Sequence, residues 1–248
     1  MSAIQAMWLR QLKKYWRSKP RMIGSLGQPV LFLIALGFGF GPIFEKSGQG
    51  NYIQFLAPGI IAMSILFTAM FTGIEVIWDR QFGFLKETLV SPTSRTSIFL
   101  GRTLGGATVA TIQGIIVLLI TILVGFRPAN LFILPTVIIF MFLIAFIFTA
   151  FGTAIATKLE DMQAFPIIIN FVIMPIFFLS GALFPLEGTS KTILKIAIFN
   201  PLSYGVDALR AILTNNSHFG LITDSIVIIT CVLLLTIIGS HAFSKIEA

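Results

Sequence analysis

Charged residues are scarce in this sequence. Of its 248 residues, 11% are Asp, Glu, Lys or Arg, while 56% are hydrophobic. Soluble domains carry about 25% charged residues, which they need to cover a surface that faces water. The shortage of charge therefore excludes a soluble enzyme, a nucleic-acid-binding domain and a disordered tail, and it indicates a polytopic membrane protein.

Cysteine, histidine and the motifs of common catalytic sites are also scarce or absent. The single cysteine, Cys231, excludes an intramolecular disulfide and a cysteine-based metal cluster. The two histidines, His218 and His241, are far apart and have no carboxylate at ligand spacing. The sequence contains no GxxxxGKS or GxxxxGKT loop for phosphates, no HExxH pair and no GxSxG turn. We expect no enzyme activity, no catalytic residue, no metal site and no cofactor on this chain, so uphill transport would need energy from a partner.

Long apolar runs are the dominant feature that is present. A bilayer core about 30 Å thick takes about 20 residues per helical span. The sequence therefore predicts an all-α transmembrane fold in one domain, residues 1–248, with six spanning helices. They are expected at Met22–Phe44, Ile53–Val76, Ile98–Phe126, Leu131–Thr157, Ala164–Phe184 and Ile222–Phe243.

The distribution of basic residues predicts the orientation of these spans. With both termini inside, the inner segments hold twelve Lys and Arg residues and the outer segments hold five. An excess of positive charge marks the cytoplasmic side. Both termini are therefore expected in the cytoplasm.

The first 21 residues combine a basic face with an aromatic face. Such a segment is typical of a helix that lies in the cytoplasmic interface and contacts membrane lipid. The residues that carry the pattern are Trp8, Arg10, Lys13, Lys14, Tyr15 and Trp16. Glycines four residues apart, as at Gly101 and Gly105, permit another helix to approach closely.

The inner connection at residues 75–102 is longer than a simple turn. Ile77, Phe84, Leu85 and Leu89 follow helical spacing, which favours a short amphipathic helix that Pro92 would end. Its charged residues suit docking to a charged soluble surface, although an ordinary interfacial loop with solvated charges explains them equally well.

The outer connection at residues 185–221 reads as two short apolar helices separated by Asn200 and Pro201. They are too short to span a bilayer and too apolar for full exposure, so we expect a re-entrant hairpin packed in protein. Asp207 and Arg210, three residues apart, are expected to pair on one helix face. Such a hairpin would serve as a gate or as a passive lid.

Two stretches resemble ABC-2 type transporter permeases, in the branch of drug-resistance and nodulation-type exporters. The first is Asp79-Arg80, Gly83, Leu85-Lys86-Glu87-Thr88-Leu89, Ser91-Pro92 and Gly101-Arg102. The second runs from Phe177 to Leu186 and from Asn200 to Arg210. Their order, their spacing and the chain length agree with the family over nearly the whole chain.

The resemblance implies a partner-driven exporter. Such permeases work as dimers, with a second copy or a paralogue, in the prokaryotic plasma (inner) membrane. They bind two copies of an ABC ATPase, which holds the ATP and magnesium, and they export drugs, lipids or lipid-linked glycans. The implied ATPase-coupling residues are Asp79, Arg80, Gly83, Leu85, Lys86 and Glu87. The implied outer-gate residues are Phe177, Phe178, Ser180, Gly181, Phe184, Pro185, Asn200, Pro201, Tyr204, Asp207 and Arg210.

Two other functions remain open from the sequence. The middles of the six runs contain no ionisable residue, which suits a passive channel or a membrane scaffold as well as a permease. An ion-coupled transporter would need an ionisable group at membrane depth, and the closest candidate is Glu75.

Overall fold

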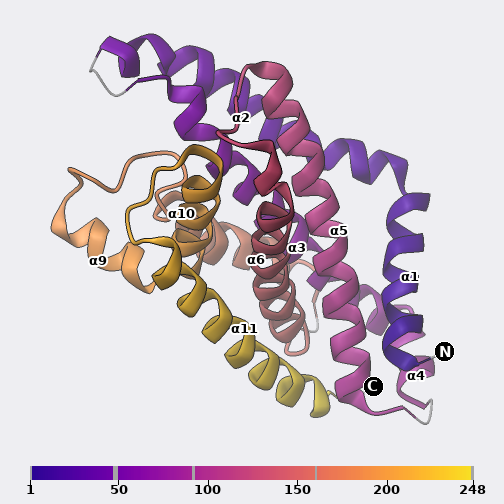
Figure 1. Cartoon of the computed structure of the whole chain (residues 1–248). Coiled ribbons are helices and arrows are strands. Elements are labelled where there is room, and N and C mark those ends of the chain that lie inside the picture. The colour runs from indigo at the N-terminus through magenta and orange to yellow at the C-terminus, as the bar shows by residue number, and fades with distance from the viewer. Residues whose placement is uncertain (1, 47–49, 91–92, 160, 247–248) are drawn as a thin grey trace.

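The computed structural model describes residues 2–46, 50–90, 93–159 and 161–246, and its regular elements in these ranges are all helical. Figure 1 shows the long helices gathered into one bundle. Five helices are long and apolar enough to cross a membrane. They are α2 (Lys19–Lys46), α3 (Tyr52–Gln81), α5 (Arg95–Val124), α6 (Leu134–Ala156) and α11 (Leu221–Ser244).

Shorter helices occupy the remaining described segments. The N-terminal helix α1 (Ala3–Arg17) precedes the bundle, and α4 (Phe84–Val90) follows α3. The other elements are η1 (Leu131–Ile133), α7 (Ala164–Ile168), η2 (Ile169–Ile173), α8 (Met174–Phe178), α9 (Lys191–Phe199) and α10 (Pro201–Thr214).

The central helix is α3. It packs against α2, α5, α6 and α10, and almost all of its apolar stretch is buried. Helices α2 and α11 lie at the periphery, where few of their apolar side chains are fully buried. The core of the protein is therefore built around α3 rather than shared equally among the helices.

The fifth predicted span, Ala164–Phe184, is shorter in the structure. One helical stretch formed by α7, η2 and α8 ends at Phe178 and contains 15 residues. At 1.5 Å per residue it covers about 22 Å, which is less than the bilayer core. The chain then turns at Gly181, which has a φ of +75°. The structure thus contains five candidate spans in its described residues, or six if the bent pair α9–α10 counts as one.

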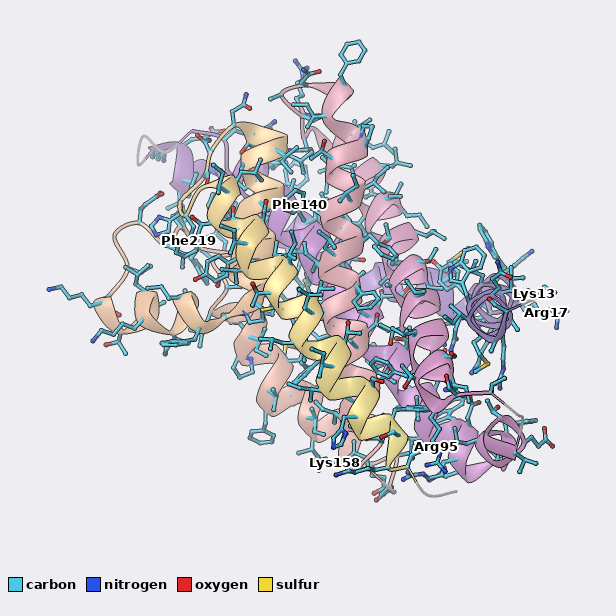
Figure 2. All side chains as sticks on the ribbon, turned by 60° about the horizontal axis from the view of Figure 1, so that its bottom comes forward. Lys13, Arg17, Arg95, Phe140, Lys158 and Phe219 are labelled. Atoms are coloured by element: carbon cyan, nitrogen blue, oxygen red, sulfur yellow. The ribbon has the colours of Figure 1, made fainter. Side chains whose placement is uncertain are left out.

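The connections that we predict on the same side of a membrane gather at the same end of the bundle. Arg80, at the end of α3, donates hydrogen bonds to carbonyls at the end of α6, and Arg95, at the start of α5, donates to carbonyls of Ser244 and Ile246. At the opposite end, Tyr52 donates to the carbonyl of Leu183. Figure 2 shows Arg95 and Lys158 at the end of the bundle where α11 terminates, remote from Phe219. These contacts place the ends of α3, α6 and α11 and the start of α5 at one end of the bundle and the start of α3 at the other, and which end faces the cytoplasm stays a prediction.

Helix α1 runs beside α5 (Figure 1), and two glycines make this possible. A Cβ at Gly101 would lie 2.8 Å from the carbonyl of Ile4, and a Cβ at Gly105 would lie 2.6 Å from the side chain of Gln11. Only glycine leaves room for this approach, as the four-residue spacing predicts. The N-terminal helix is therefore packed on the bundle; its position relative to a membrane interface stays a prediction.

Candidate coupling and transport sites

Two carboxylates lie one turn apart near the end of α3. Glu75 and Asp79 are both almost fully buried, and each is contacted by two cations. Lys14 Nζ lies 3.1 Å from Glu75 Oε2, and Arg21 contacts the other oxygen of the same carboxylate. The two carboxylates therefore need basic partners from other helices, because a buried unpaired charge is costly.

Asp79 connects α3 to α1 and α5. Arg10 Nη2 lies 3.3 Å from Asp79 Oδ1, and Arg102 contacts Asp79 Oδ2. Arg102 is 2% exposed, so Asp79 is the counter-charge that permits this guanidinium in the core. Removal of one partner from a buried pair typically costs about 3–5 kcal/mol. The cluster fixes α1, the start of α2 and α5 around the end of α3.

Arg80 has a different structural role. Its guanidinium donates hydrogen bonds to the carbonyls of Thr157, at 3.0 Å, and Leu159, at 3.2 Å. These carbonyls follow the end of α6, where helical acceptors lack intrahelical partners. Arg80 therefore caps α6 from the neighbouring helix.

The placement of Asp79 and Arg80 corrects the predicted short amphipathic helix, which we expected to include them. Helix α3 continues to Gln81, and both side chains turn inward to pair with other helices. Their charges drew the prediction toward a docking surface, whereas ion pairs hold Asp79 inside and backbone carbonyls hold Arg80. The short helix is the separate α4, which ends at Val90; Pro92 lies outside the described residues.

Among its described side chains, helix α4 has one that is fully buried and several that are exposed. Gly83, with a φ of +78°, makes the turn after α3, and Leu85 is fully buried. Around this anchor, Phe82, Phe84 and Val90 are exposed, as is the carboxylate-bearing Glu87. The side chain of Lys86 lies outside the described ones. The result is an apolar and acidic surface on a short helix at the end of the bundle.

The aromatic face of α1 points to α5. Trp8 donates from Nε1 to Thr108 Oγ1 at 3.1 Å, and the Tyr15 hydroxyl donates to Gln113 Oε1 at 2.5 Å. Burial raises the pKa of Tyr15, and the nearby Arg21 partly opposes this shift, so the phenol stays a neutral donor. Trp16 is 59% exposed and does not share this contact.

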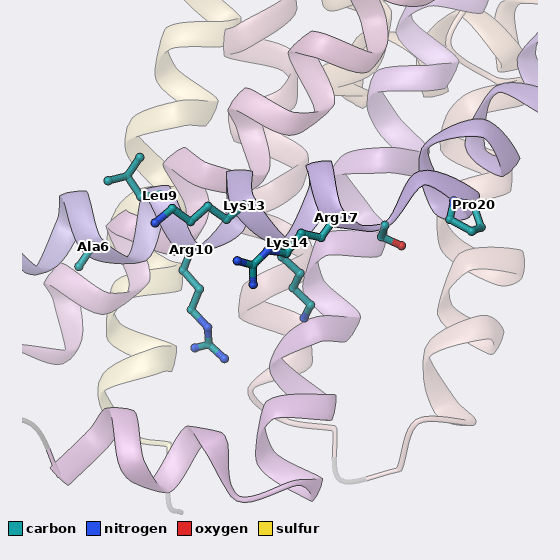
Figure 3. Close-up of a pocket in the computed structure, with 8 residues that line it drawn as sticks. Ala6, Leu9, Arg10, Lys13, Lys14, Arg17 and Pro20 are labelled. Atoms are coloured by element: carbon teal, nitrogen blue, oxygen red, sulfur yellow. The ribbon is translucent and has the colours of Figure 1, made fainter.

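The basic face of α1 borders two hollows. One is a groove of about 710 Å³ beneath α1, lined by Arg10, Lys13, Lys14 and Arg17; Figure 3 shows Arg10 and Lys14 extending below the helix. The other is a cavity of about 780 Å³ between α1, α2 and α3. Lys14, Ser18 and Pro20 line both hollows. The cavity between α1, α2 and α3 is also lined by Arg21, Pro29, Ser64, Phe67, Thr68, Phe71, Glu75 and Trp78.

At the opposite end, the predicted gate residues form a tightly bonded turn. Phe177 is fully buried and packs edge-on against Phe67, with ring centroids 6.2 Å apart. Ser180 Oγ donates to the carbonyl of Phe177 and accepts from the amide of Ala182. Gly59 on α3 lies against this turn so closely that a Cβ there would overlap the Ala182 carbonyl. Phe178 and Phe184 are exposed, and Pro185 is half-buried.

Asp207 and Arg210 do not form the predicted pair. Asp207 accepts hydrogen bonds from Ser217 Oγ and from the amides of His218 and Phe219. Arg210 instead donates to the Gly181 carbonyl at 3.0 Å. The prediction was wrong because Asp207 accepts its hydrogen bonds from donors in the loop after α10. Both residues line an outer hollow of about 580 Å³.

The predicted break at Asn200 and Pro201 is present. Helices α9 and α10 meet there at 92°. Asn200 Oδ1 accepts from the Leu202 amide, while its Nδ2 donates to the Ile176 carbonyl at 2.6 Å. Tyr204 donates to the Ile198 carbonyl across the bend. The bend is fixed by side chains, and its depth in a membrane stays a prediction.

Sequence reasoning missed the role of Arg21 and Arg102 as partners of the α3 carboxylates. The sequence did carry a signal for the cluster, though not for these two arginines: Glu75 with Asp79, and Arg10 with Lys14, are each four residues apart, which places two like charges on one helix face. Such faces attract each other when helices pack. Across the described residues, no group of three His, Cys, Asp or Glu side chains is arranged to hold a metal ion.

Comparison with known proteins agrees with this architecture. The family model of ABC-2 type transporters matches residues 2–214. A transport permease called ycf38 from Porphyra purpurea is 29% identical and is matched over 98% of this chain and 88% of its own length. Its counterpart from Pyropia yezoensis is 31% identical, over 84% of this chain and 72% of the relative. Nodulation protein J of Rhizobium leguminosarum bv. viciae is 28% identical, over 83% and 80%. The chain belongs to the ABC-2 type transporter family and is a membrane transport permease.

Proposed function

We propose that this chain is the membrane subunit of an ATP-driven exporter of hydrophobic or amphiphilic molecules. The ATP and magnesium are held by two copies of a separate ABC ATPase. The permease works as a dimer, with a second copy or a paralogue, in a prokaryotic inner membrane with both termini in the cytoplasm. The resemblance of the two connections to exporters supports this direction of transport.

The observation that carries the proposal is the geometry of α4. It presents Phe84 and Glu87 to solvent at the end of the bundle, and the turn at Gly83 joins it to α3. An exposed apolar surface with a charge at its edge suits a protein contact. A shift of α4 by the ATPase would reach α3 directly.

The charge cluster supplies the next step. Since Glu75 and Asp79 bind α1, α2 and α5 through four cations, a movement of the end of α3 would move those helices as a body. Rigid-body displacement of packed helices is a common route from a binding event to an open path. Asp79 and Arg80 thus couple from within the bundle, while α4 makes the external contact.

Exposed apolar surface is available for the dimer contact. Helices α2 and α11 carry many exposed hydrophobic side chains, which lipid or a second permease must cover. Examples are Ile23, Leu31, Phe38, Ile43, Ile222, Ile226, Leu233 and Ile237.

The test has two stages. A pull-down from native cells in mild detergent should recover an ATPase with a phosphate-binding loop in stoichiometric amount. In vesicles that contain both proteins, Glu87→Lys should leave the complex folded and ATP hydrolysis intact but abolish ATP-dependent export. The exposed Glu45→Lys at the other end of the bundle serves as the matched control. Unchanged export in Glu87→Lys would refute the role of α4, and transport that needs no ATP would favour a passive channel.

A further inference from the structure

The cavity between α1, α2 and α3 has a charged end and an apolar end. Lys14, Arg21 and Glu75 line the first, and Phe67 and Phe71 line the second. Its volume of about 780 Å³ lies within the range of small-molecule sites. Its polarity is therefore graded along the axis of α3.

Along α3 the cavity lining runs from Ser64 to Trp78, and the part of it from Ser64 to Glu75 matches one leaflet of a bilayer. Glu75 and Ser64 both line it and are eleven residues apart on α3. At 1.5 Å per residue this separation is about 16 Å, half the thickness of a hydrocarbon core about 30 Å thick. If Glu75 lies at the cytoplasmic headgroups, as the proposed orientation requires, Ser64 lies near the middle of the membrane.

The charged end carries an excess of positive charge. Lys14 and Arg21 share the single carboxylate of Glu75, which leaves one net positive charge. Both cations remain partly exposed, at 39% and 36% of their side-chain area. An ammonium has three N–H donors and a guanidinium five, so donors remain for an anionic group.

The end of the cavity that is remote from Glu75 contains a polar atom without a hydrogen-bond partner. Ser64 is 2% exposed, and its hydroxyl has no hydrogen-bond partner in the structure. Buried hydroxyls in proteins are nearly always paired, but an alkyl chain has neither donor nor acceptor, so Ser64 marks where the cavity lining begins on α3 and is not a polar contact of the ligand. Phe71 and Trp78 are each more than 40% exposed, so the wall of the cavity offers apolar contact to a chain that enters from the side.

We infer that this cavity binds an anionic, single-chain amphiphile taken from the cytoplasmic leaflet. Its acidic head lies between Lys14 and Arg21, and its chain runs along Phe67 and Phe71 toward Ser64. The inference rests on the proposed function for the orientation of the membrane and for the treatment of the bound molecule as cargo.

Photolabelling tests the location and the charge preference. The full-length protein in nanodiscs of zwitterionic lipid is exposed to dodecyl phosphate that carries a photoreactive diazirine near the chain end. We expect label within residues 64–71 of α3, and we expect unlabelled dodecyl phosphate to compete for it. Dodecyltrimethylammonium has the same chain and the opposite charge, so it should compete about tenfold less well, the effect of one lost charge-assisted contact. Equal competition, or label mainly on α11, would overturn the inference.

Variants test the head site in both directions. Arg21→Gln should weaken binding of dodecyl phosphate about tenfold, because one charged donor is lost. Arg17→Gln, on the exposed part of α1, is the matched control and should leave the affinity unchanged. Glu75→Gln should tighten binding, since it frees two cations from their carboxylate. Weaker binding in Glu75→Gln, in protein whose unfolding temperature matches that of the wild type, would overturn the inference.

Addition of the partner ATPase and ATP separates the inference from the proposed function. If export of other amphiphiles proceeds while dodecyl phosphate does not bind, the cavity inference is refuted and the proposed function stands. If dodecyl phosphate binds at residues 64–71 but ATP does not move it to the opposite side, the cavity holds a resident lipid and its role as a cargo site is refuted.

Discussion

The guanidinium of Arg210 lies 4.1 Å from the centre of the Phe55 ring. The same group donates a hydrogen bond to the carbonyl of Gly181. Arg210 on α10 therefore joins α3 to the turn that follows α8, three segments that are far apart in the sequence. Because the guanidinium of Arg210 contacts the Phe55 ring and the Gly181 carbonyl at the same time, it restricts the movement of that turn.

Replacement of Arg210 should loosen this turn. Arg210→Met removes the hydrogen bond to Gly181 and the contact with the Phe55 ring, so we expect a loss of about 2 kcal/mol in stability. Thermal unfolding of the purified protein in detergent measures the change. Lys195→Met, an exposed cation on α9, should unfold at the same temperature as the wild type. If both variants unfold alike, Arg210 does not hold the turn.

The buried pair of Asp79 and Arg102 predicts a strong non-additive effect. Asp79→Ala leaves the guanidinium of Arg102 buried without its counter-charge, which should cost about 3–5 kcal/mol. The double variant Asp79→Ala with Arg102→Met should recover much of this loss. A double-mutant cycle from unfolding temperatures gives the coupling. Additive losses would contradict the pairing, and the exposed Glu45→Gln should have no effect.

The turn between α3 and α4 depends on the left-handed backbone of Gly83. A side chain at a φ of +78° costs about 1–2 kcal/mol. We therefore expect Gly83→Ala to shift α4 and to lower the amount of substrate exported per ATP hydrolysed, while the bundle stays folded. Gly39→Ala is the control, because that glycine is helical and a Cβ there would meet open space. Normal export per ATP in Gly83→Ala would show that the turn tolerates a side chain.

Contact between α3 and the outer turn leaves no space for a methyl group at Gly59. A Cβ would overlap the carbonyl of Ala182, so the turn must move outward in Gly59→Ala. Overpacking of this kind typically costs about 1–3 kcal/mol. Limited proteolysis should cut Gly59→Ala faster than wild type near the exposed residues Glu187 and Gly188. An unchanged cleavage rate would argue that the turn adapts without loosening.

The sequence predicted the membrane class and most helices correctly because apolar length is a local signal. The five candidate spans agree with predicted runs to within a few residues, as α11 illustrates. The prediction for the fifth run was wrong for a local reason as well. Residues 179–184 are mostly apolar, but the chain turns at Gly181 and does not continue as a helix.

The fate of individual charges was harder to predict, because pairing depends on which helices meet. Asp79 and Arg80 read as a solvent-facing pair, yet their partners are Arg102 and the carbonyls after α6. Asp207 has Arg210 nearby in the sequence but accepts from the amides of His218 and Phe219, eleven and twelve residues later. Long-range packing decided each case, and one-dimensional spacing carries little information about it.

The central helix α3 takes part in the contacts at both ends of the bundle. Near one end, Tyr52, Phe55 and Gly59 contact the outer turn and Arg210; near the other, Glu75 and Asp79 hold the basic helices. Its 30 residues form a rod of about 45 Å at 1.5 Å per residue. Because other helices hold it near both ends, α3 is expected to transmit a displacement along its axis. The cluster at Glu75 and Asp79 and the turn at Gly181 are thus expected to move together when α3 is displaced, so a mutation at one of them should have a measurable effect at the other.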